Sequence, residues 1–213
     1  MNRADAFGLL SQGVAVAAAV RTATLVARRD APRGGRAPRA WVFAAVVAAS
    51  VAVPFAGTTV ARELRALWGD PSATTVVLLA LLAAWPRALP ALPRAGSLLA
   101  FALVAGTLLL GPTFTGWHPA GLDVHALGFR AWPVLLAALP WFVVAWHRRA
   151  GGWVAVAGAA LLLWGTGVVQ SDNAWDALVD PALVGWAAWM GIAQLAHRAA
   201  ARRGALRPSR AAA

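Results

Sequence analysis

The chain has 213 residues, of which 60% are hydrophobic and only 13% are charged, with a mean hydropathy of +0.64. It contains no Cys and no Lys, which excludes disulfides, thiolate metal sites, cysteine nucleophiles and lysine Schiff bases. This composition is too apolar for a soluble domain of this size. We therefore predict an all-α fold, a polytopic transmembrane helix bundle with short loops.

Apolar segments of near-spanning length recur along the chain, and a less apolar seventh segment precedes them. The seventh, residues 6–27, carries Ser11, Gln12 and Arg21. It either spans the membrane, which puts the N-terminus outside, or lies along the interface. Small residues at four-residue spacing, Ala15, Ala19, Ala23 and Ala27, favour spanning, because they let helix backbones approach closely. The other six predicted spans are residues 41–60, 73–90, 96–113, 131–147, 152–170 and 181–198.

The charged residues set a predicted orientation. Basic residues fill four regions: 28–39, 87–94, 147–149 and the tail after 198. The positive-inside rule places these regions and the C-terminus in the cytoplasm, and the intervening loops outside. The cytoplasmic arginines are also expected to contact anionic lipid. The net charge of +11 does not predict nucleic-acid binding, because the arginines lie at the ends of apolar segments and form no single patch.

The sequence predicts one integral membrane domain over residues 1–213. Residues 1–40 would form an N-terminal helix and a basic cytoplasmic loop, residues 41–198 a six-helix membrane core, and residues 199–213 a disordered basic tail. All 19 basic residues are Arg, and Ala and Gly are abundant, which is typical of GC-rich bacterial genomes. The predicted location is therefore the bacterial inner membrane, with several passes.

The stretch QSDNAWDALVDP holds three of the eight acidic side chains, Asp172, Asp176 and Asp180. If residues 172–180 form a helix, these aspartates share one face, where like charges repel unless a cation or an Arg-rich partner neutralises them. The alternative is helix capping. Asp180-Pro181 and Asp70-Pro71 both have the pattern of a helix start, and Asp172 would cap a short turn.

The second candidate site is the outer loop from residue 117 to 125. His118, Asp123 and His125 are ligand types for a divalent metal, and topology places them on the same side as Asp172 and Asp176. These five residues form a candidate outer-face site for Zn or Cu. The alternative is an ordinary turn, because Pro119 and Gly121 favour one.

A haem b site is a further candidate on the cytoplasmic side. It would need two axial histidines on neighbouring helices, and His147 and His197 fit that topology. Both lie beside Arg at predicted helix ends, where side chains ordinarily reach toward the headgroups. No cofactor is therefore predicted as the main interpretation.

Three classes of function remain. The first is a non-catalytic accessory or scaffolding subunit that packs against other membrane proteins. The second is a small-solute permease or substrate-binding component, with a polar pocket from Gln194, Thr166, Trp164 and Trp186. The third is a metal- or haem-binding redox protein. No predicted span has an acidic side chain, Lys or His at its centre, which disfavours a proton pump and a buried catalytic dyad. An accessory subunit, and not an enzyme, is the main prediction.

Overall fold

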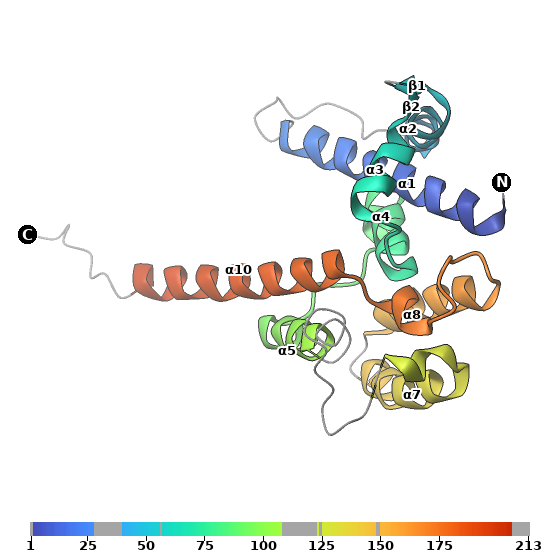
Figure 1. Ribbon diagram of the computed structural model, residues 1–213. Coiled ribbons are helices and arrows are strands. Elements are labelled where there is room, and N and C mark those ends of the chain that lie inside the picture. Colours follow the sequence, from blue (N-terminus) through green and yellow to red (C-terminus); the bar gives the residue numbers. More distant parts are fainter. Residues whose placement is uncertain are drawn as a thin grey trace, which may run out of the picture. The chain divides into compact units, whose positions relative to one another are not determined.

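The computed structural model describes residues 2–27, 40–55, 57–107, 123, 125–147 and 150–205. The described chain is mostly helical, as predicted (Figure 1). It divides into two compact units: Met1–Ala91 with Ala126–Asp180, and Leu92–His125 with Pro181–Ala213.

The first unit contains most of the helices. In chain order its elements are α1 (Arg3–Ala27), α2 (Ala40–Ala52), β1 (Pro54–Phe55), β2 (Thr58–Thr59), α3 (Val60–Trp68), α4 (Ala73–Ala84), η1 (Pro86–Ala88), η4 (Ala126–Phe129), α7 (Ala131–His147), α8 (Gly151–Gly165) and α9 (Ala174–Leu178). The strands form a short antiparallel pair in which Pro54 faces Thr59 and Phe55 faces Thr58. The second unit contains α5 (Ala95–Ala105) and α10 (Pro181–Ala205).

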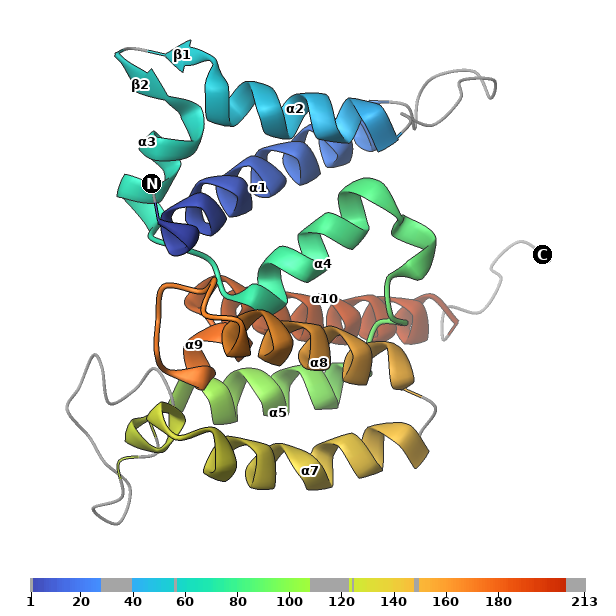
Figure 2. The same cartoon turned by 90° about the vertical axis from the view of Figure 1, so that its right-hand side faces the viewer.

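Helix α1 packs against α2 and α4 through small side chains, and Figure 2 shows α1 running beside α2. Ala17, Ala18 and Ala83 are buried at the centre of this contact. Gly13 lets the backbones approach, because a Cβ there would lie 3.0 Å from both Ser50 Oγ and Val47 Cγ1. The buried face of α1 thus differs from the predicted alanine stripe.

The predicted stripe lines a groove instead. Ala19 and Ala23 are exposed, and with Ala15 they border an apolar groove of about 750 Å³ between α1 and α4. Ala19 and Ala23 therefore lie outside the close helix contact, and the stripe as support for a spanning helix stays a prediction. The four-residue spacing of these alanines predicted a helix but did not identify its packed face, because Ala17 and Ala18 are equally small and are the ones buried.

Several helices end earlier than the apolar segments predicted. Helix α2 ends at Ala52, since Pro54 lacks an N–H and Gly57 turns the chain with φ 86°. Helix α4 ends at Ala84, because Pro86 disfavours helical backbone at the preceding residue. Helix α8 ends at Gly165, ahead of Gly167 with φ 68°. Helix α7 matches its predicted segment, and α10 begins at the predicted residue but continues to Ala205.

One described helix is long and apolar enough to cross a bilayer. It is Arg3–Thr24, with a mean hydropathy of 1.3 over its best window, of which 39% is buried. Signal sequences and core helices of soluble proteins share these properties, so this helix does not by itself establish a membrane protein. The least apolar predicted span, residues 6–27, is thus the one whose helix is long and apolar enough to cross a bilayer. Shorter apolar helices lie at Val42–Ala52, Ala73–Ala84, Ala95–Ala105 and Gly151–Gly165.

In the second unit, α5 lies alongside α10 (Figures 1 and 2). Gly191 of α10 sits against α5, where a Cβ would lie 2.7 Å from Leu99 Cγ and 3.2 Å from the carbonyl oxygen of Ala95. One turn along, Gln194 Nε2 donates a hydrogen bond to the carbonyl oxygen of Pro93 at 3.0 Å. Close backbone contact and one side-chain hydrogen bond therefore fix the register of this pair.

Replacing Gly191 with Ala should destabilise the α5–α10 pair. A methyl group there overpacks a tight contact, which typically costs about 1–3 kcal/mol. Gly185→Ala in the same helix is the matched control, because nothing lies within 4 Å of its Cβ position. That control should gain up to about 1 kcal/mol from helix propensity. Thermal unfolding followed by circular dichroism would compare the two, and equal Tm values would contradict the close contact.

Candidate functional site

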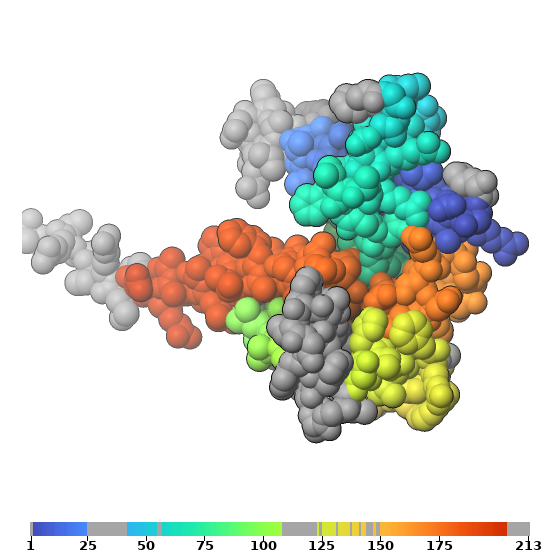
Figure 3. Space-filling view, in the orientation of Figure 1, coloured from blue at the N-terminus to red at the C-terminus, as the bar shows by residue number. Residues whose placement is uncertain are grey.

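The candidate site is built on α3, which the local sequence defines clearly. Thr59 caps its start, where the side chain accepts a hydrogen bond from the N–H of Arg62 at 3.4 Å. The helix ends at Gly69, which has φ 72° and whose N–H donates a hydrogen bond to the carbonyl oxygen of Arg65. Ala61 is fully buried, while Leu67 and Trp68 are 75% and 82% exposed. Helix α3 is amphipathic, and it packs against the first half of α1, part of which it covers in the space-filling view (Figure 3).

Arg65 is the centre of a polar cluster, which we call the Arg65 cluster. Its Nε lies 2.8 Å from Asp70 Oδ1, and its Nη2 donates to Asp70 Oδ2 at 2.9 Å. Nη1 contacts Asp5 Oδ1 at 3.3 Å, and Nη2 also donates to Gln170 Oε1 at 3.0 Å. One guanidinium therefore joins the start of α1, the turn between α3 and α4, and the segment after α8.

The electrostatics of the Arg65 cluster favour the charged guanidinium. The hydrogen bond to Asp70 is the largest cause that raises the pKa of Arg65 above its ordinary value; partial burial opposes this, and Asp5 adds to it. A base with a raised pKa in the folded state contributes stability that is fully present below its ordinary pKa. That contribution is lost only as the pH rises through the raised value, so Arg65 stays charged across the neutral range.

Two residues of α1 let the helix approach this cluster. A Cβ on Gly8 would lie 2.6 Å from Asp70 Oδ1 and 2.8 Å from Arg65 Cζ, so a larger residue would push the ion pair away. One turn further, Gln12 Nε2 donates a hydrogen bond to the carbonyl oxygen of Gly69 at 2.6 Å. Gly8 and Gln12 thus hold α1 against the α3–α4 turn.

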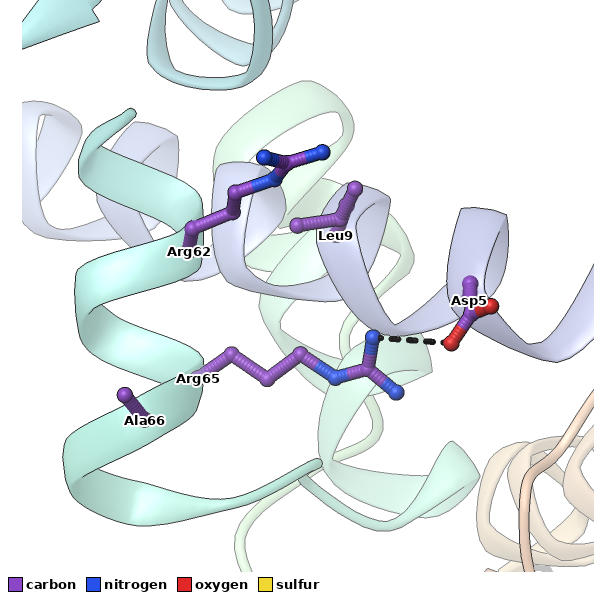
Figure 4. Close-up of a pocket in the computed structure, with 5 residues that line it drawn as sticks. All are labelled: Asp5, Leu9, Arg62, Arg65 and Ala66. Carbon is purple, nitrogen blue, oxygen red and sulfur yellow. Dashed lines mark hydrogen bonds and ion pairs between the residues drawn. The ribbon is translucent and has the colours of Figure 1, made fainter. Parts of the chain in front are cut away.

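A pocket of about 550 Å³ opens beside the ion pair, between α1 and α3. Its lining residues are Asp5, Leu9, Arg62, Arg65 and Ala66, and Figure 4 shows Arg65 reaching to Asp5 while Arg62 lies closer to Leu9. Among the described residues, no side-chain or backbone acceptor pairs with the Arg62 guanidinium. The lining carries both signs of charge and two apolar side chains, which suits binding.

The three aspartates of residues 172–180 do not share a helix face, so that prediction is wrong. Helix α9 covers only Ala174–Leu178, which leaves Asp172 before it and Asp180 after it. Asn173, and not Asp172, caps α9, its Oδ1 accepting from the N–H of Trp175 at 2.9 Å. The side chain of Asp176 accepts from Ser171 Oγ at 2.6 Å.

Asp180 immediately precedes α10, as the predicted helix start requires, and it also has a long-range role. Its buried Oδ2 accepts from the backbone N–H of Ser72 at 2.7 Å. Ser72 is the cap of α4, where its Oγ accepts from the N–H of Thr75 at 3.2 Å. The prediction that Asp70-Pro71 starts this helix is therefore wrong by two residues, and Asp70 pairs with Arg65 instead.

The predicted metal and haem sites stay predictions. His118 lies outside the described residues, Asp123 and His125 belong to the second unit, and Asp172 and Asp176 are exposed in the first. Within the described ranges, no three His, Cys, Asp or Glu residues come together as a metal site. The haem ligands are likewise divided, since His147 is exposed in the first unit and His197 in the second.

Sequence reasoning missed the Arg65 cluster because no local pattern marks it. Asp5 and Gln170 lie 60 and 105 residues from Arg65 along the chain. The usable signals were weak: Asp70 lies five residues after Arg65, and Gly8 and Gln12 interrupt an apolar helix. Comparison of the chain with protein families, curated proteins and solved structures finds no match.

Replacing Arg65 with Lys should destabilise the first unit even though the charge is kept. An ammonium group cannot hold two oxygens of Asp70 in a fork and also reach Asp5 and Gln170. Loss of charge-assisted hydrogen bonds at this partly buried site should cost about 1–3 kcal/mol. Thermal unfolding would measure this, with Arg62→Lys as the control that leaves Tm unchanged. If Arg65→Lys also left Tm unchanged, the Arg65 cluster would not stabilise the fold.

Proposed function

We propose that the protein is a multi-pass integral protein of the bacterial inner membrane, acting as a non-catalytic accessory subunit. The observation that carries this is the exposure of large apolar side chains along whole helices. On α7, Trp132, Leu135, Leu136, Leu139 and Val143 are each between 48% and 62% exposed. Contiguous exposed apolar surface is costly in water, whereas lipid or a membrane partner covers it at no such cost.

The short helices favour a subunit that packs against others. Helices α2, α4, α5 and α8 have 13, 12, 11 and 15 residues. At 1.5 Å per residue they extend about 17–23 Å, less than the roughly 30 Å of bilayer hydrocarbon. Short hydrophobic helices are accommodated by bilayer thinning or by association with other membrane proteins. An accessory subunit sheltered in a complex meets this constraint.

Polar side chains inside the helices bond to nearby backbone, which disfavours the permease alternative. Ser11 donates to the carbonyl of Gly8 at 2.7 Å, and Ser50 to that of Val47 at 2.8 Å. Two residues of the predicted permease pocket also bond to backbone, one within its own segment and one across to a neighbouring segment. Thr166 donates to the carbonyl of Leu163 at 2.7 Å, and Gln194 to that of Pro93. A permease needs such groups directed at a solute, so the permease stays the second candidate.

The Arg65 cluster supports the seven-helix arrangement with the N-terminus outside. It joins Asp5, near the start of α1, to Asp70 and Gln170. The positive-inside rule places the segments of Asp70 and Gln170 outside. In this arrangement α1 starts on the outer side and crosses to the basic region 28–39. The C-terminus of α10, with Arg198, Arg202 and Arg203, then lies in the cytoplasm beside anionic lipid.

Purification of the full-length chain in mild detergent should separate the three functional classes. An accessory subunit predicts a colourless protein that copurifies stoichiometrically with one or more membrane proteins. Mass spectrometry, elemental analysis and an absorbance spectrum from one preparation would test this. Stoichiometric Zn, Cu or haem iron would contradict it and favour the redox alternative. A partner-free protein whose Tm rises with a small solute would favour the permease.

A further inference from the structure

The pocket beside Arg65 has a lining that selects for a particular ligand chemistry. It combines two guanidinium groups, one carboxylate and two apolar side chains within about 550 Å³. Arg65 is occupied by Asp70, Asp5 and Gln170, so it forms a fixed wall. Arg62 and Asp5 are the charged groups left to meet a ligand (Figure 4).

Arg62 provides the site for an oxyanion. It lies one helical turn before Arg65, so both side chains leave the same face of α3. No ion pair holds it among the described residues, and its side chain extends toward α1 near Leu9 (Figure 4). A guanidinium presents paired donors that match phosphate oxygens.

Asp5 provides the site for a cation. Its Oδ1 contacts Arg65 at 3.3 Å, and 43% of its side chain is exposed. The Asp5 N–H is already bonded to Asn2 Oδ1 at 2.7 Å, which fixes the backbone at this position. The exposed part of the carboxylate can therefore accept hydrogen bonds from an ammonium group in the pocket. A purely anionic ligand would bind Arg62 but face repulsion from Asp5.

The surroundings of the pocket indicate a lipid rather than a free solute. On α3, Leu67 and Trp68 are largely exposed, and Leu10 of α1 is 50% exposed. Trp and amphipathic helices concentrate at the membrane–water interface. Leu9, which is buried, and Ala66, which is exposed, give the pocket its apolar lining.

We propose that this pocket binds an aminophospholipid of the outer leaflet, with its phosphate on Arg62 and its ammonium group on Asp5. The acyl chains would leave along Ala66 and the exposed apolar side chains of α1 and α3. The proposal rests on the membrane placement given under Proposed function. It does not depend on which partner the subunit joins.

Native mass spectrometry of the full-length protein tests the proposal. The protein is mixed with equal amounts of phosphatidylethanolamine, phosphatidylglycerol and phosphatidylcholine that carry the same acyl chains. Wild-type protein should retain phosphatidylethanolamine about tenfold more than phosphatidylglycerol, the effect of one added charge-assisted hydrogen bond. Equal retention of all three lipids, or a preference for phosphatidylglycerol, would overturn the site.

Two variants and one control locate the binding. Arg62→Gln should lower phosphatidylethanolamine retention about tenfold, without changing Tm, because it removes the phosphate partner. Asp5→Asn keeps an oxygen acceptor for Arg65 but should equalise the retention of phosphatidylethanolamine and phosphatidylglycerol. Arg87→Gln, at an exposed arginine outside the pocket, should behave as wild type. An equal loss in Arg87→Gln and Arg62→Gln would mean non-specific charge attraction and would overturn the proposal.

An alkaline wash of isolated membranes distinguishes a failure of the membrane placement from a failure of the lipid site alone. If the wild-type protein is released without detergent, the membrane placement fails and the lipid site fails with it. If the protein requires detergent but shows no lipid preference, only the lipid site fails.

Discussion

The ion pair between Arg65 and Asp70 is the contact on which the arrangement of the first unit depends. Arg65 and Asp70 are only five residues apart, so the α3–α4 turn alone can bring them together. The guanidinium still has donors left, and these bond to Asp5 and Gln170. Gly8 leaves the room for α1 to reach it. A single planar group therefore ties together segments that are distant in sequence, which a point charge could not do.

The remainder of the molecule follows from how an apolar chain satisfies its polar groups. Where helices end, capping residues and buried side chains supply the hydrogen bonds, as Ser72, Asn173 and Asp180 do. Within helices, small residues such as Gly13 and Gly191 give close backbone contact. Many large apolar side chains are left exposed among the described residues, and in the proposed account lipid or a partner subunit covers them. In the proposed account, the charged groups of the first unit that could bind a ligand are therefore concentrated in and beside the Arg65 cluster, on the outer side of the membrane.

The sequence was informative about elements and poor on their contacts. Apolar segments predicted the longer helices, since hydrophobic runs and proline breaks are local signals. Helix α3 and the β1–β2 pair were not predicted, because they lie at the end of a predicted span and in the outer loop after it. The helix ends were overestimated, because Pro54 and Pro86 stop helices inside runs that remain apolar. The packed face of α1 could not be identified, because alanines lie on every side of the helix. The Arg65 cluster could not be predicted, because its members come together only in the tertiary fold. The aspartates of residues 172–180 were selected for their four-residue spacing, but the backbone there is helical only over Ala174–Leu178.

We propose that the Arg65 cluster lies on the outer side of a multi-pass membrane protein, and cysteine labelling tests this placement directly. The chain has no Cys, so single cysteines can report on each side. Arg3→Cys, Glu63→Cys, Asp172→Cys and Ala88→Cys all change exposed positions. A membrane-impermeant maleimide applied to intact spheroplasts should label the first three variants, and should label Ala88→Cys only after the membrane is broken. Equal labelling of all four before and after disruption, or protection of Arg3→Cys, would contradict the account.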